Sequence, residues 1–340
     1  MKLMNIGIIL LLVFTLIGCQ PEEYNKIPLI IYNIEDPYIK NFRDQILEDA
    51  EDLFEVISFD SKNSQIIQNE IIVEQLKKRP KAIIVNPVDR LGAYTIIEKA
   101  KEYDVPVVFF NREPLEEDLN SWSLSFYVGA LDEQSVVIQA NIIKNLFGNP
   151  ENLSSLDLNG DNNIQTLILK GEQGHQAAEI RTVHVISELE DAGYHLDLLA
   201  IEVCNWNIDE AYNFILDFIP TSSEQVELVI SNNDAMAIGA IDALIELEVF
   251  KDINEDGYYD NIDGAWIPVV GVDALSEAIP YLENGTLAGT VLNDSSTQSK
   301  AIVELVDALI NGRDPSTISF DIDNESFIWI EYKRFELEED

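Results

Sequence analysis

Positive charge is scarce in this sequence of 340 residues. Lysine and arginine together number 21 against 62 aspartates and glutamates, so the formal net charge is −41. A chain this negative repels phosphate backbones, and we therefore expect no nucleic-acid partner. The same charge disfavours anionic membrane surfaces and acidic ligands. Neutral molecules and cations are the ligand classes that remain.

Cysteine is almost absent, and one of the two cysteines lies in a leader-like segment. The first 18 residues carry one positive charge and an apolar run over positions 6–17, which is short for a membrane span but typical of a signal peptide. The run ends in Leu16-Ile17-Gly18-Cys19, which resembles the bacterial lipobox. We expect residues 1–19 to be a lipoprotein signal peptide whose lipidated Cys19 anchors an extracytoplasmic protein to the cell membrane. An ordinary signal peptide with an incidental cysteine is the alternative.

Only Cys204 remains after such processing, which excludes an internal disulfide. A single thiol could be catalytic, but a buried small apolar side chain is the interpretation we prefer.

Hydrophobic residues make up 46% of the chain, enough to bury a core, and the length suggests two domains. Apolar runs alternate with helical patterns in two series. The predicted strands are Pro28–Ile34, Phe54–Phe59, Lys81–Val85 and Val105–Phe110, then Thr166–Leu169, Leu198–Val203, Glu227–Ser231 and Pro268–Val272. Repeated βαβ units build parallel sheets covered by helices on both faces, so we predict an α/β fold with two doubly wound lobes.

Polar side chains follow many of these strands. They are Asp36, Asn86, Asn111, His175, Arg181, Asn232, Asn233, Asp234 and Asp273. Ligands bind at the carboxyl ends of parallel strands, and a hydroxyl both donates and accepts hydrogen bonds, so this set suits a polyhydroxylated ligand. Each residue alone could instead be an Asx turn or a helix cap, and we expect Asp234 to cap the helix Ala235–Leu247.

Several segments closely resemble the galactose/glucose-binding proteins of bacterial sugar ABC transporters, which are type I periplasmic binding proteins. They are Pro106–Asn111, Lys170-Gly171-Glu172 with Gly174-His175, Asn232–Ala237, Gly271–Ala274 and Leu287–Asp294. The resemblance implies two lobes that close around a monosaccharide, with an ABC permease as the partner of a monomer and a chemoreceptor as a further candidate partner. It implies an N-terminal lobe of residues 27–111 and 295–325, and a C-terminal lobe of residues 114–292 and 328–340. The chain would cross between them near 111–114, 293–295 and 323–328.

The resemblance also implies a sugar site. Asp36 and Asn86 would bind hydroxyls from the first lobe, His175, Arg181, Asn233 and Asp273 from the second, and Asn293 from a crossing, while Tyr38 and Trp206 would sandwich the ring. Apolar sugar faces pack well on aromatic rings, and the planar arginine fork can hold two adjacent hydroxyls. Without the resemblance, Tyr38 and Trp206 would be read as core residues.

One position departs from the family pattern. Ala177 stands where the family has an aspartate that binds the anomeric hydroxyl. Loss of that charge-assisted hydrogen bond removes about 1.5–3 kcal/mol. We hypothesise that the protein accepts a substituent at C1 or binds free hexoses more weakly. Gln176 or a water could instead fill the space and leave specificity unchanged.

Oxygen-bearing side chains alternate in a candidate calcium loop that begins at Asp157. The predicted Ca²⁺ ligands are Asp157, Asn159, Asp161, Asn163 through its carbonyl, and Gln165. The twelfth position, Ile168, is apolar, and the resemblance supplies the missing acid from Glu227. A solvated acidic turn is the alternative.

A second loop from Asp252 to Asp263 matches the EF-hand spacing more fully, with glycine at position six. Its possible ligands are Asp252, Asn254, Asp256, Tyr258, Asp260 and Asp263. A chain this acidic also produces such spacing by chance. Either metal would be structural.

Three other function classes are open to this sequence. A glycosidase could use Asp36 and Asp273 as paired carboxylates, although the surrounding arginine and amides are expected to keep both ionised. A sugar-responsive repressor would need an N-terminal helix-turn-helix, where this sequence has the signal segment. A chemoreceptor ligand or membrane sensor without a transport role is the third. We expect a binding protein that is not an enzyme.

Overall fold

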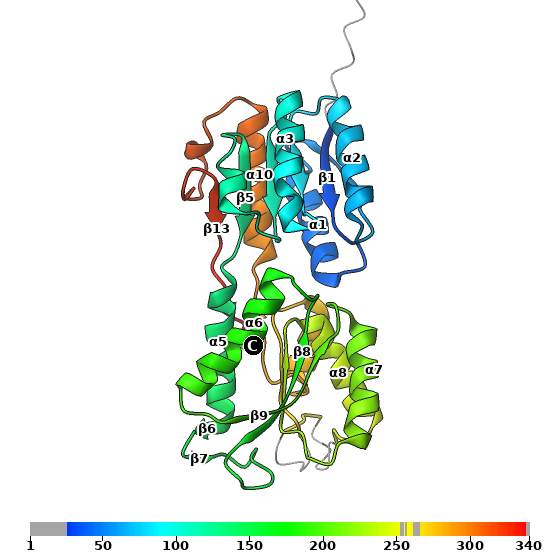
Figure 1. Cartoon of the computed structure of the whole chain (residues 1–340), viewed down its shortest axis with the longest axis vertical. Helices are drawn as coiled ribbons and strands as arrows, with labels where there is room; N and C mark the ends of the chain where they lie inside the picture. Colours follow the sequence, from blue (N-terminus) through cyan, green and yellow to red (C-terminus); the bar gives the residue numbers. More distant parts are fainter. Residues whose placement is uncertain (1–25, 252–254, 256, 261–265, 338–340) are drawn as a thin grey trace, which may run out of the picture.

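A computed structural model describes residues 26–251, 255, 257–260 and 266–337. The chain forms two α/β lobes stacked along the long axis of the molecule (Figure 1). Cys19 and most of the loop at 252–263 lie outside the described residues. Cys204 is buried, as the sequence indicated. Within the described part of the chain, none of the helices combines the length and the apolar character that spanning a bilayer requires.

The first lobe is built on a parallel sheet with the order β13-β5-β4-β3-β1-β2. Its strands are β1 (Lys26–Ile31), β2 (Glu55–Asp60), β3 (Ile83–Val85), β4 (Val107–Phe110), β5 (Ser125–Gly129) and β13 (Phe327–Trp329), and its helices are α1 (Pro37–Ala50), α2 (Gln65–Lys77), η1 (Arg90–Gly92), α3 (Ala93–Tyr103), α4 (Glu116–Leu119), α10 (Ser295–Ile310) and η4 (Pro315–Thr317). Side chains of one strand alternate between two clusters: Leu29 packs on the α1 and α10 side, and Ile30 packs on the α2 and α3 side. This alternation explains why the strands read as continuous apolar runs.

The second lobe repeats the plan with the strand order β11-β10-β8-β9. Its elements are α5 (Asp132–Phe147), β6 (Gly148–Asn149), β7 (Asn152–Leu153), β8 (Ile164–Lys170), α6 (Gln176–Asp191), β9 (Leu196–Val203), α7 (Ile208–Phe218), η2 (Ile219–Thr221), β10 (Leu228–Ser231), α8 (Asp234–Glu246), β11 (Val269–Val270), η3 (Ser276–Ala278), α9 (Ile279–Glu283), β12 (Val291–Leu292) and β14 (Lys333–Arg334). Helices α5 and α6 cover one face of the sheet, and α7 and α8 cover the other. The predicted two-lobed doubly wound fold is confirmed.

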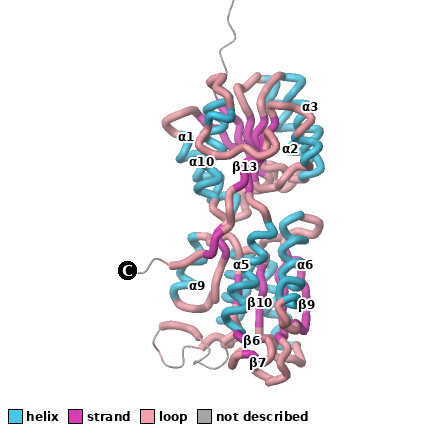
Figure 2. The backbone as a smooth tube through the Cα atoms, turned by 90° about the vertical axis from the view of Figure 1, so that its left-hand side faces the viewer, coloured by secondary structure: helices cyan, strands magenta, loops and turns pink. Residues whose placement is uncertain are grey.

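The predicted positions of two crossings are wrong by one strand each. Strand β5 pairs with β4, and β13 pairs with β5, so both belong to the first lobe. The chain therefore crosses after Gly129 and after Trp329, rather than near 111–114 and 323–328. Helix α4 between β4 and β5 has only four residues, too short for helical periodicity to reveal another βα unit. The connecting segments run between the lobes in Figure 2.

The predicted cap of helix α8 is also wrong by one residue. Asn233 is the N-cap, and its side chain accepts a hydrogen bond from the Met236 N–H. Asp234 is fully buried, and its carboxyl accepts hydrogen bonds from the Leu275 N–H and the Thr290 hydroxyl. Burial raises the pKa of Asp234 to about 7. Asp234 thus ties α8 to the segments on either side of α9, and Asn233 is left to face the interlobe space.

Gly271 accommodates this buried carboxyl, because a Cβ atom at position 271 would lie 2.1 Å from Asp234 Oδ1. We expect Gly271→Ala to lower the free energy of unfolding by about 1–3 kcal/mol, since the buried Asp234 cannot move aside. Chemical denaturation measures the change. Gly92→Ala is the control, because its Cβ would have no neighbour closer than 3.4 Å. Equal stability of the two variants would contradict the packing argument.

Candidate functional site

The strand-end residues gather around a cavity between the lobes, which we call the inner compartment. It is lined by Tyr32, Asp36, Tyr38, Asn111, Arg112, His175, Ala177, Arg181, Trp206, Asn233, Asp273 and Asn293. Eight of the nine predicted sugar-site residues are in this set. Both lobes contribute, so the compartment exists only while the lobes are together.

The first lobe contributes Asp36 at the start of α1. Asp36 Oδ1 accepts hydrogen bonds from the backbone N–H groups of Tyr38 (2.9 Å) and Ile39 (3.2 Å), and the Tyr32 hydroxyl donates to Oδ2. Asp36 is therefore both a helix cap and a cavity residue. Burial raises the pKa of its carboxyl, and the donated hydrogen bonds oppose that shift. These bonds fix the orientation of the carboxyl group before a ligand arrives.

Asn86 is the predicted site residue that the structure does not place in the cavity. It is fully buried, and its amide donates to the Asn111 side-chain oxygen (3.2 Å) and to the Phe110 carbonyl (3.3 Å). Asn111 lines the compartment instead, at the end of β4, with a positive φ of 63° that asparagine tolerates well. Asn111 also ends one of the segments that carry the family resemblance, and this was the signal that could have identified it.

His175 begins the second lobe's contribution, as the N-cap of α6. Its Nδ1 accepts a hydrogen bond from the Ala177 N–H (3.2 Å), which assigns the ring proton to Nε2. Burial lowers the pKa of His175 well below its usual value, and the positive charges of Arg112 and Arg181 lower it further. The imidazole is therefore neutral and presents one donor.

Trp206 forms the aromatic wall of the second lobe. Its ring meets the His175 ring edge-on at 5.1 Å between centroids, and its side chain is 8% exposed. A Cβ atom at Gly171 would lie 2.3 Å from the Trp206 ring, so the glycine after β8 provides the space for the indole. Tyr38 is 6% exposed on the opposite lobe. The predicted pair of aromatic residues does lie in one cavity.

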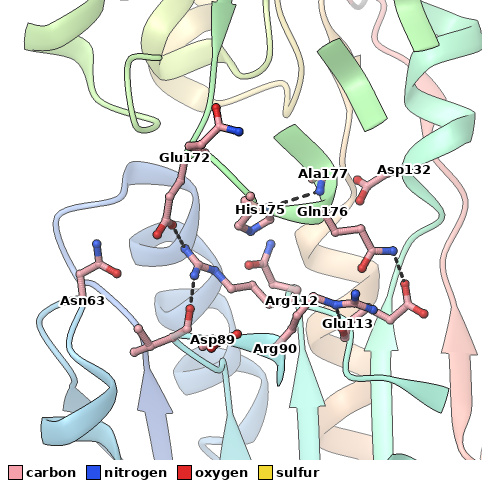
Figure 3. A pocket seen from close by; sticks show the side chains of 14 residues that line it. Asn63, Asp89, Arg90, Arg112, Glu113, Asp132, Glu172, His175, Gln176 and Ala177 are labelled. Carbon is pink, nitrogen blue, oxygen red and sulfur yellow. Dashed lines mark hydrogen bonds and ion pairs between the residues drawn. The ribbon is translucent and has the colours of Figure 1, made fainter. Parts of the chain in front are cut away.

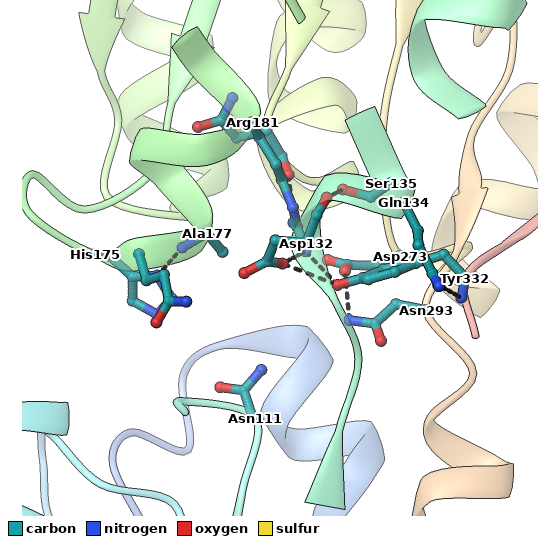
Figure 4. A network of polar contacts seen from close by, with 12 residues as sticks. Asn111, Asp132, Gln134, Ser135, His175, Ala177, Arg181, Asp273, Asn293 and Tyr332 are labelled. Carbon is teal, nitrogen blue, oxygen red and sulfur yellow. Dashed lines mark hydrogen bonds and ion pairs between the residues drawn. The ribbon is translucent and has the colours of Figure 1, made fainter. Parts of the chain in front are cut away.

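Arg181 is held largely by protein partners, contrary to the expectation that its fork is free for two hydroxyls. It donates to the Asn232 carbonyl (2.8 Å), to Asp132 (3.2 Å) and to the Tyr332 hydroxyl (2.8 Å) (Figure 4). The Arg181 Nε–H is buried and has no hydrogen-bond partner in the described part of the chain. The guanidinium is thus fixed in place, and few of its five N–H groups are available to a ligand. Asp132 and Tyr332 follow the crossings after β5 and β13, and no motif in the sequence indicates their role.

A series of side-chain contacts connects the two lobes of the site across the hinge. Asn293 donates to Asp273 (3.3 Å) and accepts from Gln298 on α10 (2.7 Å), which in turn lies 3.5 Å from the Tyr38 hydroxyl. Asp273 is 6% exposed, and burial raises the pKa of its carboxyl although the positive charge of Arg181 opposes the shift. We expected the arginine and amides to keep Asp36 and Asp273 ionised without a raised pKa; the pKa of both carboxyls is instead raised, because burial outweighs these groups.

Two polar contacts join the lobes beside the cavity. Arg112 forms an ion pair with Glu172 (2.8 Å), and Gln176 donates to Glu113 (2.9 Å) (Figure 3). The Arg112 guanidinium also lies 3.9 Å from the centre of the Tyr32 ring. Sequence reasoning missed Arg112, whose position directly after the strand-end Asn111 was the available signal.

The first candidate calcium loop is compact and folded around its acidic side chains. Asp157 accepts from the backbone N–H groups of Gly160 (2.8 Å) and Asn162 (2.9 Å), and Gln165 donates to Asp161 (3.0 Å). Among the described residues, no three histidine, cysteine or acidic side chains converge to hold a metal by themselves. A cation here would therefore need the amide oxygens as well.

Glu227 approaches this loop from the start of β10. Its carboxylate is 1% exposed and accepts backbone N–H groups of Leu158 (2.6 Å), Asn159 (3.4 Å) and Gln165 (3.3 Å). Burial raises the pKa of Glu227, and these donors oppose the shift. The Gln165 side-chain oxygen is buried, and none of the described residues donates a hydrogen bond to it. A buried carboxylate beside an unpaired amide oxygen is the donor chemistry that Ca²⁺ prefers, so the residues fit this ion.

The comparison with known proteins identifies the family. The periplasmic binding protein domain matches residues 27–314. The chain belongs to the periplasmic binding protein family. It is 38% identical over 293 residues to the D-galactose/methyl-galactoside binding periplasmic protein MglB of Haemophilus influenzae, covering 85% of this chain and 82% of the relative. A xylitol-binding protein of Mycolicibacterium smegmatis is 27% identical over 69% of this chain and 58% of its own length.

The solved structures agree on the fold. An ABC transporter periplasmic solute binding protein of Actinobacillus succinogenes, with bound D-allose, superposes with a TM-score of 0.74 at 18% identity, over 91% of this chain and 96% of that one. The resemblance noted in the sequence is confirmed at the level of the family.

The neutral His175 leads to a pH prediction. The pKa of this histidine is lower in the folded than in the unfolded state, so its contribution to the free energy of unfolding is fully present above a pH of about 6.5. This contribution is lost as the pH falls toward the pKa of the folded state. His175→Asn keeps a cap acceptor and a donor but does not titrate. We expect the wild type to lose stability relative to this variant between pH 7.5 and 5.5, measured by denaturant unfolding. The exposed His184→Asn on the same helix should leave the wild-type profile unchanged, and identical profiles for all three proteins would refute the assignment.

Proposed function

We propose that this protein captures a monosaccharide between its two lobes and delivers it to an ABC permease. The observation that carries the proposal is the inner compartment, which carboxylates, amides, a neutral imidazole and arginines line together with Tyr38 and Trp206. Hydroxyls match both the donors and the acceptors of this set, and the aromatic rings match the apolar faces of a pyranose. Kinship with MglB favours galactose, glucose or a related hexose.

Transport requires that the lobes open and close. Closure brings Arg112 to Glu172 and Gln176 to Glu113, while the crossings after β5, β12 and β13 supply the hinge. A sensor that passes the closed form to a chemoreceptor would use the same motion and is the second candidate. A glycosidase is disfavoured because the family consists of binding proteins for transport.

We further propose that the protein is a monomer attached to the cell membrane through a lipid on Cys19. The support is the apolar run followed by Leu16-Ile17-Gly18-Cys19 in the sequence. The loop of Asp157, Asn159, Asp161, Asn163 and Gln165, together with Glu227, is proposed as a structural Ca²⁺ site. The second loop at 252–263 is a possible further site on sequence spacing alone.

Sugar binding is tested by calorimetric titration of D-galactose and D-glucose. We expect one hexose to bind at a single site and Asp273→Asn to weaken it by roughly 5- to 150-fold, because an acceptor oxygen of the buried site is lost. Trp206→Ala should weaken it as well, while Trp122→Phe in the distant core of the first lobe should not. Absence of heat with any monosaccharide would contradict the proposal.

Calcium binding is tested by thermal unfolding with Ca²⁺ or with EDTA. At a Ca²⁺ concentration 100 times its Kd, the fold should gain about 2.7 kcal/mol, seen as a higher Tm. Glu227→Gln should remove most of this gain, because it removes the only buried acid of the set. Asp197→Asn, an equal charge change at the exposed position paired with Gln165 in the sheet, should keep it. An unchanged Tm in EDTA would show that the loop is only an acidic turn.

A further inference from the structure

A second and larger cavity adjoins the inner compartment. We call it the outer compartment, and its volume is about 330 Å³ against about 40 Å³ for the inner one. Four residues line both: Asn111, Arg112, His175 and Ala177. Because the inner space is small, a sugar ring held by the buried polar side chains reaches this shared wall. The Ala177 side chain ends at its Cβ atom, so it blocks little of the space between the two compartments.

The outer compartment is polar and carries both signs of charge. Arg90 and Arg112 line it together with Glu113 and Glu172 (Figure 3). Asn63 and Gln176 add amide groups to the lining. A hydroxyl can donate to the carboxylates and accept from the arginines and amides. The lining therefore suits a polyhydroxylated group better than an apolar one.

Both lobes form this second space. Arg90, Arg112 and Glu113 come from the first lobe, and Glu172 and Gln176 come from the second. The ion pair Arg112–Glu172 and the hydrogen bond Gln176–Glu113 join its two sides. A group bound here would contact both lobes, just as the sugar ring does in the inner compartment.

We propose that the outer compartment is a second subsite, which holds a polar group joined to the bound hexose, so that the ligand is a disaccharide or a polyol glycoside. In such compounds the anomeric oxygen carries the second group, and a ring bound with this oxygen toward Ala177, which lines both compartments, would direct that group into the outer one. The inference rests on the proposed monosaccharide site and adds the identity of the complete ligand.

The experiment compares free hexoses with their glycosides by calorimetry on the full chain. The probes are D-galactose and D-glucose, their methyl glycosides, and disaccharides and glycerol glycosides with α and β linkages. We expect at least one disaccharide or glycerol glycoside to bind at least tenfold more tightly than the corresponding free hexose. Tighter binding of a free hexose than of every glycoside would overturn the inference but leave the monosaccharide site intact. If neither class binds, the proposed function fails as well.

Two variants locate the second group. Ala177→Asp, which extends a side chain into the shared wall, should weaken the preferred glycoside at least tenfold more than the free hexose. Arg90→Ala should weaken the glycoside more than the hexose, whereas Lys101→Ala, an equal charge change on α3, should alter neither. A glycoside-to-hexose affinity ratio that is the same in the wild type and in Ala177→Asp would overturn the assignment of the outer compartment.

Discussion

Burial of polar side chains between the lobes is the constraint on which the rest of this structure depends. Asp36, Asn233 and Asp273 lie at the ends of strands or helices and Arg181 lies in the second turn of α6, where a single lobe would leave them in water. When the lobes meet, these groups lose water and must be paired. The protein pairs most of them internally, as in the contacts of Arg181 with Asp132 and Tyr332. The atoms left over define what the cavity can bind.

The same internal pairing limits how much the site can adjust to a ligand. Asp36 is fixed by two backbone donors and the Tyr32 hydroxyl, His175 by the Ala177 N–H, and Asn233 by the Met236 N–H. All three residues are helix N-caps, so their positions follow from the starts of α1, α6 and α8. Helix capping therefore does not exclude ligand binding. In each residue one polar side-chain atom accepts the capping hydrogen bond, and the other polar atom can contact a ligand. Preorganised groups of this kind lose little entropy when a ligand binds.

The architecture could be predicted from the sequence, because buried parallel strands appear in it as apolar runs. The prediction was wrong where no local sequence pattern marks the structural feature. Helix α4 is a single turn, so helical periodicity does not reveal the βα unit that ends in β5, and the first crossing is predicted one strand too early. Asn86 and Asn111 both follow strands, and which of them faces the ligand depends on a backbone turn at φ 63° that the spacing does not encode. The contact of Arg112 with Glu172 joins residues 60 positions apart and forms only when the lobes meet. Such long-range pairs are set by closure, which no local pattern specifies.

Closure and ligand binding are linked in this molecule through a shared set of residues. Arg112 lines both compartments, lies over the Tyr32 ring of its own lobe and pairs with Glu172 of the other. Its interlobe contact exists only in the closed state, and the ligand makes its full set of contacts only in that state. Each therefore favours the other, and the affinity for a ligand includes the free energy of bringing the lobes together. A ligand that contacted one lobe alone would shift the equilibrium between open and closed lobes only a little. A cavity divided between two lobes therefore closes around the complete ligand in preference to a fragment of it.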